Sequence, residues 1–168
     1  MSEPLEVRSG RASDLPALLE QYNHYVREGH AIFDEVEATL VERERWFAGY
    51  STDGPHRLLV AEAGGVVLGF CSSQPYRAHP AFRESVEVSV MLAPDSRGQG
   101  VGTRLYEHLF AELAGEPLHR AYAGIALPNP ASCALHERFG FTRIGVFDEY
   151  AQKRGRRISS AWYEKRLG

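Results

Sequence analysis

The chain has 168 residues, of which 43% are hydrophobic and 24% charged, and its formal net charge is −3. A chain of this length and composition is typical of one globular domain that buries roughly 70% of its extended surface. Intrinsic disorder is excluded, because the low net charge accompanies 8 Phe, 8 Tyr and 2 Trp. We therefore expect a single domain over residues 1–168.

The sequence does not indicate membrane insertion or secretion. No apolar stretch approaches the roughly 20 residues that a membrane helix needs, and Met1–Pro4 lacks a basic flank followed by an apolar core. The two cysteines, Cys71 and Cys133, lack the spacing of a metal site or a redox pair. We expect a cytoplasmic protein with reduced thiols, no metal and no membrane partner.

The small net charge conceals an asymmetry along the chain. Residues 152–168 carry six basic side chains and one acidic side chain, whereas the rest of the chain carries 13 basic and 21 acidic side chains. The acidic body argues against nucleic-acid binding, which requires a broad basic face for phosphate contacts. The basic end is either a site for a small anion or solvated surface charge.

In the first half, hydrophobic spacing predicts two helices and a hairpin. A strand at 5–8 precedes a helix that Ser13 caps, and the apolar side of this helix holds Leu15, Leu18, Leu19, Tyr22, Tyr25 and Val26. Thr39 and Glu42 form a capping-box pattern for a second helix over about 40–50. Strands at 57–62 and 66–72 flank Ala63-Gly64-Gly65, which predicts a tight turn.

The second half alternates strands and helices. The clearest strand is 85–92, where β-branched residues alternate with Glu87 and Ser89. A glycine-rich loop follows, and then a helix with an apolar side formed by Leu105, Tyr106, Leu109, Phe110 and Leu113. We further predict a strand at 122–126, a helix over 130–139 that Gly140 ends, and strands at 143–147 and 158–164. This order indicates an α/β (α+β) protein with a mixed sheet.

The loop between that strand and helix carries glycine at positions 98, 100 and 102. Free amides and the dipole at a helix start favour an anion, and missing Cβ atoms let a phosphate approach the backbone. Relief of backbone strain in a tight turn is the alternative explanation. The loop lacks the Gly-Lys-Ser/Thr ending of a Walker loop and the G-x-G-x-x-G pattern, so ATP and NAD are not indicated.

Several segments together resemble one family. Arg97-Gly98-Gln99-Gly100-Val101-Gly102 resembles the Gln/Arg-x-x-Gly-x-Gly/Ala pyrophosphate loop of the GNAT acetyltransferases. The phosphinothricin and methionine sulfone N-acetyltransferase branch is similar in further segments: 22–26, Phe33, Trp46, 77–83, 127–132, 135–137 and 139–141. The resemblance spans nearly the whole chain. It implies a GNAT fold, whose mixed, mostly antiparallel central sheet is splayed between two parallel strands and flanked by helices on both faces.

The resemblance implies acetyl-CoA as a co-substrate and no metal. The pyrophosphate would lie on the backbone amides of Arg97, Gly98, Gln99, Gly100, Val101, Gly102 and Thr103. The pantetheine arm would pair with the backbone of Val90, Met91 and Leu92, and an N–H near Met91 would stabilise the oxyanion. Asn129 and Ser132 match positions near the CoA arm, although Asn129 serves equally well as a helix cap.

The resemblance also assigns roles in catalysis and substrate binding. Glu87 matches the acid proposed as the base for the substrate ammonium, whereas its strand pattern alone indicates an outward-facing acid. His136 stands where many members have a Tyr that protonates the thiolate, and it is an acid, a water-relay member or a packed helix residue. Arg77 and Arg83 would bind a carboxylate, phosphinate or sulfone oxygen or lie in a solvated loop, and Phe33 would wall the side-chain pocket or join the core.

The implied activity is direct transfer of an acetyl group from acetyl-CoA to the α-amine of phosphinothricin, methionine sulfone, methionine sulfoximine or a similar small amine, by a homodimer. The alternatives are a different acceptor (protein lysine, polyamine or aminoglycoside) and a CoA-binding sensor without turnover. The chain departs from the branch after Lys153-Arg154-Gly155, because Arg157 and Ser159 stand where Trp and Asp are usual. We expect its substrate specificity to differ there.

Overall fold

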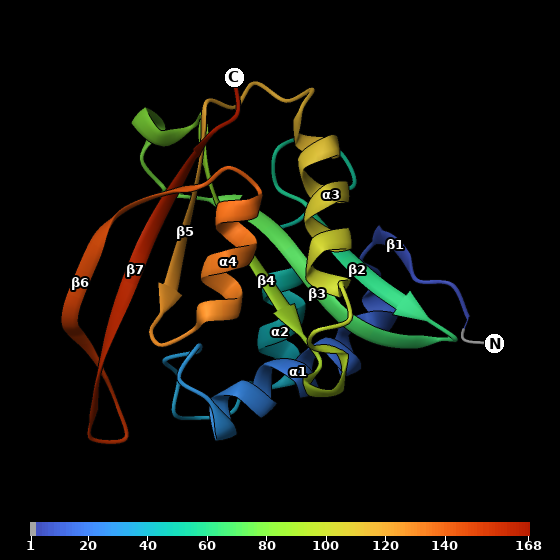
Figure 1. Ribbon diagram of the computed structural model, residues 1–168. Coiled ribbons are helices and arrows are strands. Elements are labelled where there is room, and N and C mark those ends of the chain that lie inside the picture. The colour runs from blue at the N-terminus through green and yellow to red at the C-terminus, as the bar shows by residue number, and fades with distance from the viewer. Residues whose placement is uncertain (1–2) are drawn as a thin grey trace.

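The computed structural model describes residues 3–168, so Met1 and Ser2 of the Met1–Pro4 segment considered above lie outside the described residues. Figure 1 shows the elements, which in chain order are β1 (Glu6–Ser9), α1 (Leu15–Glu28), α2 (Leu40–Phe47), β2 (Leu58–Ala63), β3 (Val66–Pro75), β4 (Ser85–Leu92), α3 (Val101–Leu113), β5 (Arg120–Ala126), α4 (Pro130–Arg138), β6 (Thr142–Lys153) and β7 (Arg156–Arg166). Within residues 3–168, no helix combines the length and apolar character needed to cross a membrane.

The strands form a seven-stranded sheet in the order β1-β2-β3-β4-β5-β7-β6. Among the described residues, β4 and β5 form the one parallel pair, and all the other neighbouring strands are antiparallel. The predicted mixed, mostly antiparallel sheet is therefore confirmed.

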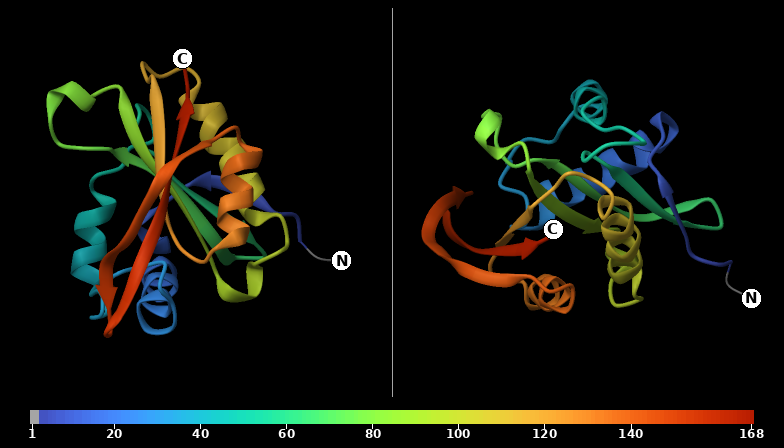
Figure 2. Two further views of the ribbon diagram at one scale, coloured as in Figure 1. Left: turned by 60° about the vertical axis from the view of Figure 1, so that its left-hand side comes forward. Right: turned by 90° about the horizontal axis from the view of Figure 1, so that it is seen from above.

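The helices cover both faces of this sheet, because successive strand residues point to opposite sides. On β2, Leu58 and Val60 pack on one face with Phe70, where α1 and α2 lie. Leu59 and Ala61 face the other side, where α3 supplies a row of buried side chains. Figure 2 shows α1 and α2 on one side of the sheet and α3 and α4 on the other, which confirms the predicted layers.

The turns and caps confirm most of the predicted boundaries. Gly64 and Gly65 close the β2–β3 hairpin with φ of 58° and 76°, a left-handed conformation that side chains disfavour. The capping box of Thr39 and Glu42 starts α2 as predicted. The prediction of Ser13 as a cap is wrong, because Asp14 occupies the N-cap position of α1, where its carboxylate accepts hydrogen bonds from Arg8.

The last hairpin is longer than its sequence pattern indicates. The predicted strand at 143–147 is the first part of β6, which continues to Lys153. The pairing with β7 is irregular between Phe147 and Ala151, and Glu149 has a φ of 47°. This irregularity breaks the two-residue alternation that reveals a strand, so the second part of β6 escapes prediction.

Candidate functional site

The two parallel strands separate after a short contact. β4 and β5 are paired from Ser85 to Glu87 and from Arg120 to Tyr122. Beyond this point β4 continues beside β3, while β5 continues beside β7. Residues 88–92 of β4 therefore have a backbone edge that no strand within residues 3–168 covers, at the place where the resemblance puts the pantetheine arm.

Alternation of hydrogen bonding shows which residues of β4 face this opening. The N–H groups of Tyr76 and Ala93 donate to the carbonyls of Ser85 and Leu68, so the odd-numbered residues of β4 exchange hydrogen bonds with β3. The backbone groups of Val90 and Leu92 then point into the opening, whereas those of Met91 point to β3. The Leu92 carbonyl accepts a hydrogen bond from the Tyr25 hydroxyl at 2.5 Å.

The glycine loop joins β4 to the first turn of α3. Gly98 and Gly100 have φ values of 73° and 78°, and a Cβ added at either would meet no atom within 4 Å. Gly100 is the N-cap and supplies no side chain, so the first-turn amides, which have no partner within the helix, are available to an anion. Gly102 has a different role, because a Cβ there would lie 3.2 Å from the Leu135 side chain. The loop therefore fits a pyrophosphate.

The other side chains of this loop hold its shape. The Arg97 guanidinium donates to the Tyr25 hydroxyl at 2.8 Å, and the Gln99 amide donates to the Asp95 carbonyl at 2.6 Å. Thr103 accepts a hydrogen bond from Arg138 of α4 at 3.0 Å. Residues 97–103 therefore offer backbone amides to a ligand, whereas the side chains of Arg97, Gln99 and Thr103 form hydrogen bonds within the protein.

A cavity of about 220 Å³ extends from the separated strands to the face of the sheet that α1 and α2 cover. Polar or aromatic side chains in its lining are Tyr22, Arg43, Trp46, Tyr50, Phe70, Ser72, Gln74, Glu87, Ser89, Asn129, Ser132 and His136. The cavity therefore brings together predicted residues from β4 and α4 with residues of α1, α2 and β3. Within residues 3–168, His, Cys, Asp and Glu form no group of three that could hold a metal ion.

Glu87 is a half-buried carboxylate in this lining. It lies opposite Gln74 of β3 and Tyr122 of β5, at the last residue pair before the parallel strands separate. Among residues 3–168, no hydrogen bond or ion pair engages its side chain, and burial raises the pKa of the carboxyl above its ordinary value. A free carboxylate with a raised pKa, at the point where the strands open, has the properties of a general base.

His136 is almost entirely buried in α4, and both of its ring nitrogens are engaged. Nδ1 lies 2.7 Å from the Ser132 carbonyl and Nε2 lies 2.9 Å from the Tyr106 hydroxyl. A carbonyl only accepts, so Nδ1 carries the proton and Nε2 accepts from Tyr106. Burial lowers the pKa of the imidazole, which favours this neutral form. The geometry favours a packed helix residue over a free proton donor.

Asn129 and Ser132 lie at the start of α4 and also line the cavity. Asn129 is the N-cap, and its side-chain oxygen accepts from the Ser132 amide at 3.1 Å. The alternative that Asn129 caps a helix is therefore confirmed. Its amide group and the Ser132 hydroxyl remain beside the opening in which the CoA arm is expected.

Three predicted substrate-binding side chains lie outside the cavity lining. Phe33 is 38% exposed and packs edge-on against Tyr150 of β6. Arg77 stacks over Tyr76, and Arg83 is an exposed residue that pairs with the neighbouring Glu84 at 3.8 Å. The lining that contains Glu87 therefore includes none of these three side chains.

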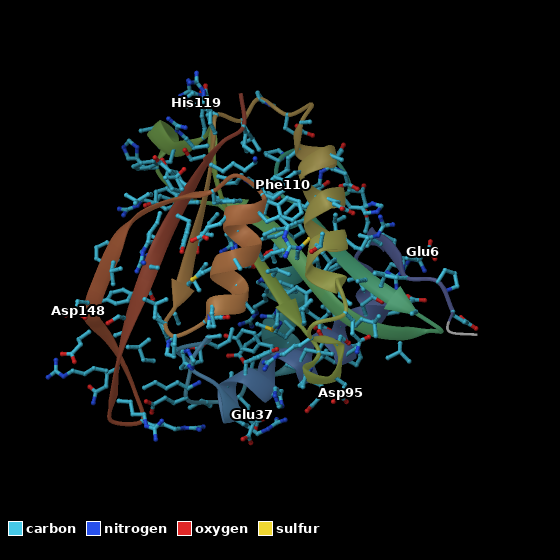
Figure 3. The ribbon with its side chains drawn as sticks, viewed as in Figure 1. Glu6, Glu37, Asp95, Phe110, His119 and Asp148 are labelled. Carbon is cyan, nitrogen blue, oxygen red and sulfur yellow. The ribbon has the colours of Figure 1, made fainter. Side chains whose placement is uncertain are left out.

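The basic end of the chain also lies outside the lining. Ser159 binds the irregular part of β6 through Asp148 and the Glu149 amide, and Arg157 is exposed on β7. Figure 3 shows Asp148 at the outer edge of this hairpin, far from Asp95 in the loop before α3. The buried Lys153 ammonium instead donates to three backbone carbonyls at the end of α1 and just after it, which fixes the segment that leads to α2.

Sequence reasoning missed the side of the cavity formed by α2. Arg43, Trp46 and Tyr50 lie three and four residues apart, so they share one face of α2 and the turn that follows it. A charged residue on the apolar stripe of a short helix is the signal that indicates Arg43. Nothing in the sequence alone shows that this stripe faces β4.

The chain matches the family model described as "Acetyltransferase (GNAT) family" over residues 17–141. It is 48% identical over 165 residues to a phosphinothricin N-acetyltransferase of Streptomyces coelicolor, covering 97% of this chain and 96% of that protein. It is 34% identical over 161 residues to an L-methionine sulfoximine/L-methionine sulfone acetyltransferase of Pseudomonas aeruginosa, covering 96% and 94% of the two chains. The crystal structure of a GNAT superfamily phosphinothricin acetyltransferase from Sinorhizobium meliloti in complex with AcCoA superposes with a TM-score of 0.92 at 28% identity, covering 98% and 89% of the two chains. The chain therefore belongs to the acetyltransferase (GNAT) family and is an acetyl-CoA-dependent N-acetyltransferase.

Proposed function

We propose that this enzyme acetylates the α-amine of a small amino-acid-like compound such as phosphinothricin, methionine sulfone or methionine sulfoximine. The observation that carries the proposal is the cavity in which the Glu87 carboxylate, with no partner among residues 3–168, lies at the opening between β4 and β5. The relatives named above act on amino acids of this kind according to their names, and the similarity covers almost the whole chain. The chain acts as one domain over residues 1–168.

Acetyl-CoA supplies an activated acetyl thioester when bound. We propose that the amides of residues 97–103 bind its pyrophosphate and that the backbone of Val90 and Leu92 orients the pantetheine arm. Because Met91 directs its amide toward β3, the Val90 N–H is the donor that stabilises negative charge on the thioester oxygen. Asn129 and Ser132 line the path of the arm.

Glu87 acts as the general base. An α-ammonium group cannot attack until it loses a proton, and Glu87 accepts that proton directly or through one water. Its raised pKa brings the carboxyl closer to neutral pH, where a base is most effective. The amine then attacks directly, with no acyl group attached to the protein.

His136 acts as a positioning residue in this proposal. Its Nε2 accepts from Tyr106 of α3 and its Nδ1 donates to the Ser132 carbonyl within α4, so His136 holds the Ser132 turn of α4 against α3. Contact of Arg77, Arg83 and Phe33 with the substrate stays a proposal, and none of the three lines the cavity.

We also propose a homodimer in the cytoplasm. β6 is an edge strand, and its exposed apolar side chains include Ile144, Val146, Phe147 and Tyr150. An exposed edge with large apolar side chains is a surface suited to association. A second copy covering β6 removes these side chains from water.

The test is acetyl-CoA-dependent thiol release across a panel of amines. The panel contains phosphinothricin, methionine sulfone, methionine sulfoximine, a lysine peptide, spermidine and an aminoglycoside. We expect fast release with the first three compounds. Release with only the last three indicates a different acceptor, and acetyl-CoA binding without release with any amine indicates a sensor.

A further inference from the structure

Arg43 of α2 is a buried cation that pairs with no carboxylate in the described part of the chain. The residue is 6% exposed, and its Nε has no hydrogen-bond partner among residues 3–168. None of the ion pairs formed within that part of the chain includes Arg43. A buried guanidinium normally pairs with a carboxylate, because removing its charge from water is costly. Burial of this charge without a carboxylate beside it therefore needs an explanation.

Two aromatic rings hold the guanidinium in place. Its central carbon lies 3.6 Å from the centroid of Trp46 and 4.5 Å from that of Tyr22. Such cation–π contacts stabilise the charge without using its N–H groups, which lie in the plane of the guanidinium. Since Nε is out of reach of solvent, the terminal Nη groups are the donors available to the cavity that Arg43 lines.

The same cavity holds the proposed base. Glu87 and Arg43 both line it, together with Tyr50, whose hydroxyl donates to Gln74, the residue opposite Glu87 on β3. On the other side of Arg43, Asp34 and Glu42 line a second cavity. Asp34 accepts from the Tyr22 hydroxyl and Glu42 from Thr39, so both carboxylates are already engaged with other groups. An anion that enters the first cavity would meet Arg43 without competition from a bound carboxylate.

We propose that Arg43 binds the α-carboxylate of the acceptor amino acid and so directs its α-amine toward Glu87. This inference rests on the proposed function and names the residue that selects an amino acid. The carboxylate is the anion that phosphinothricin and methionine sulfone share, since a sulfone carries no charge. A planar guanidinium fixed by two rings offers parallel donors to both carboxylate oxygens.

The experiment compares L-methionine sulfone with 3-(methylsulfonyl)propylamine, which has the same side chain and amine but no carboxylate. In the Arg43→Gln enzyme we expect kcat/KM for the amino acid to fall about 100-fold, because the buried substrate carboxylate loses its cationic partner. The kcat/KM for the decarboxylated amine should fall far less. Arg43→Lys keeps the positive charge but loses the two parallel donors of the guanidinium, so we expect an intermediate fall in kcat/KM. Arg45→Gln changes an exposed arginine of the same helix and serves as the control. Melting temperature and acetyl-CoA affinity report on folding.

Equal losses for both substrates in Arg43→Gln would overturn the inference, because they would mean that Arg43 only supports the fold. A wild-type enzyme that acetylates no amino acid but does acetylate other amines would refute the proposed function instead. If the variants do not fold, NMR of the ¹⁵N,¹³C-arginine-labelled wild-type protein decides. Methionine sulfone should then shift the guanidinium signals of Arg43 and the decarboxylated amine should not, and identical spectra with both compounds would contradict the inference.

Discussion

Replacing Glu87 with Gln tests the proposed base most directly, because the exchange keeps the shape of the side chain. No hydrogen bond or ion pair among residues 3–168 depends on the carboxylate, so Gln breaks no contact in the fold. General bases contribute about 10²–10⁴-fold to rate, and we expect kcat/KM at pH 7 to fall within that range.

The pH dependence separates loss of the base from other damage. In the wild-type enzyme, burial raises the pKa of Glu87, so kcat/KM should rise with pH as this carboxyl ionises. In the Gln variant the remaining reaction requires amine that has already lost its proton. Its rate should therefore rise about tenfold per pH unit up to the pKa of the substrate amine, as expected when only the neutral form reacts. Thiol release at saturating acetyl-CoA from pH 6 to pH 9.5 measures both profiles.

Thermal stability provides the control. The raised pKa of Glu87 determines whether the Gln variant is more or less stable than the wild type at a given pH. The pKa of Glu87 is higher in the folded protein than its ordinary value of 4.5, so the folded state binds the proton more tightly. The stabilisation from this group is complete below pH 4.5 and is lost as the pH rises through the folded value. The Gln variant should therefore melt at or above the wild-type temperature at pH 8. Unchanged kinetics in a folded Gln variant would refute the assignment of Glu87 as the base.

Three further substitutions test other parts of the site and surface. Gly100→Ala forces a side chain into a φ of 78°, so it should cost about 1–2 kcal/mol of stability and raise the KM for acetyl-CoA, whereas Gly115→Ala, which meets open space, should change neither. His136→Phe removes two buried hydrogen bonds, so it should lower the free energy of unfolding by about 1–3 kcal/mol in urea titrations and affect kcat by less than tenfold; a large loss of kcat at unchanged stability would indicate an acid. Phe147→Asp should convert a dimer to a monomer in light scattering, and Val66→Asp, at an equally exposed position on another hairpin, should not.

The parts of the fold that were predictable are those with a local signal. The strand 85–92 alternates apolar and polar residues and has the bounds of β4. The glycines at 98 and 100 have the left-handed backbone that only glycine adopts freely. Each of these features is decided by a few adjacent residues, which the sequence displays directly.

The parts of the site that were not predictable depend on contacts between distant residues. The partner that fixes the tautomer of His136 is Tyr106, 30 residues away, so its three alternatives stayed open in the sequence. Arg77 and Arg83 lie in a loop whose path no local pattern determines, and Phe33 turns toward Tyr150 on the last hairpin. The spacing of residues predicts which of them share one face of a helix or strand, but it does not show which element that face packs against.

The charged residues illustrate the same point, because the number of basic residues in a segment does not show where their side chains lie. The basic excess of residues 152–168 suggested an anion site, yet Lys153 binds three backbone carbonyls and Arg157 points to solvent. The cation that lines the cavity is Arg43. It belongs to the acidic body of the chain, so no local excess of basic residues marks its position. Solvent screens exposed charges, whereas a buried unpaired charge acts strongly on whatever enters its cavity. The specificity of this enzyme therefore depends more on the burial of one arginine than on the number of basic residues at its end.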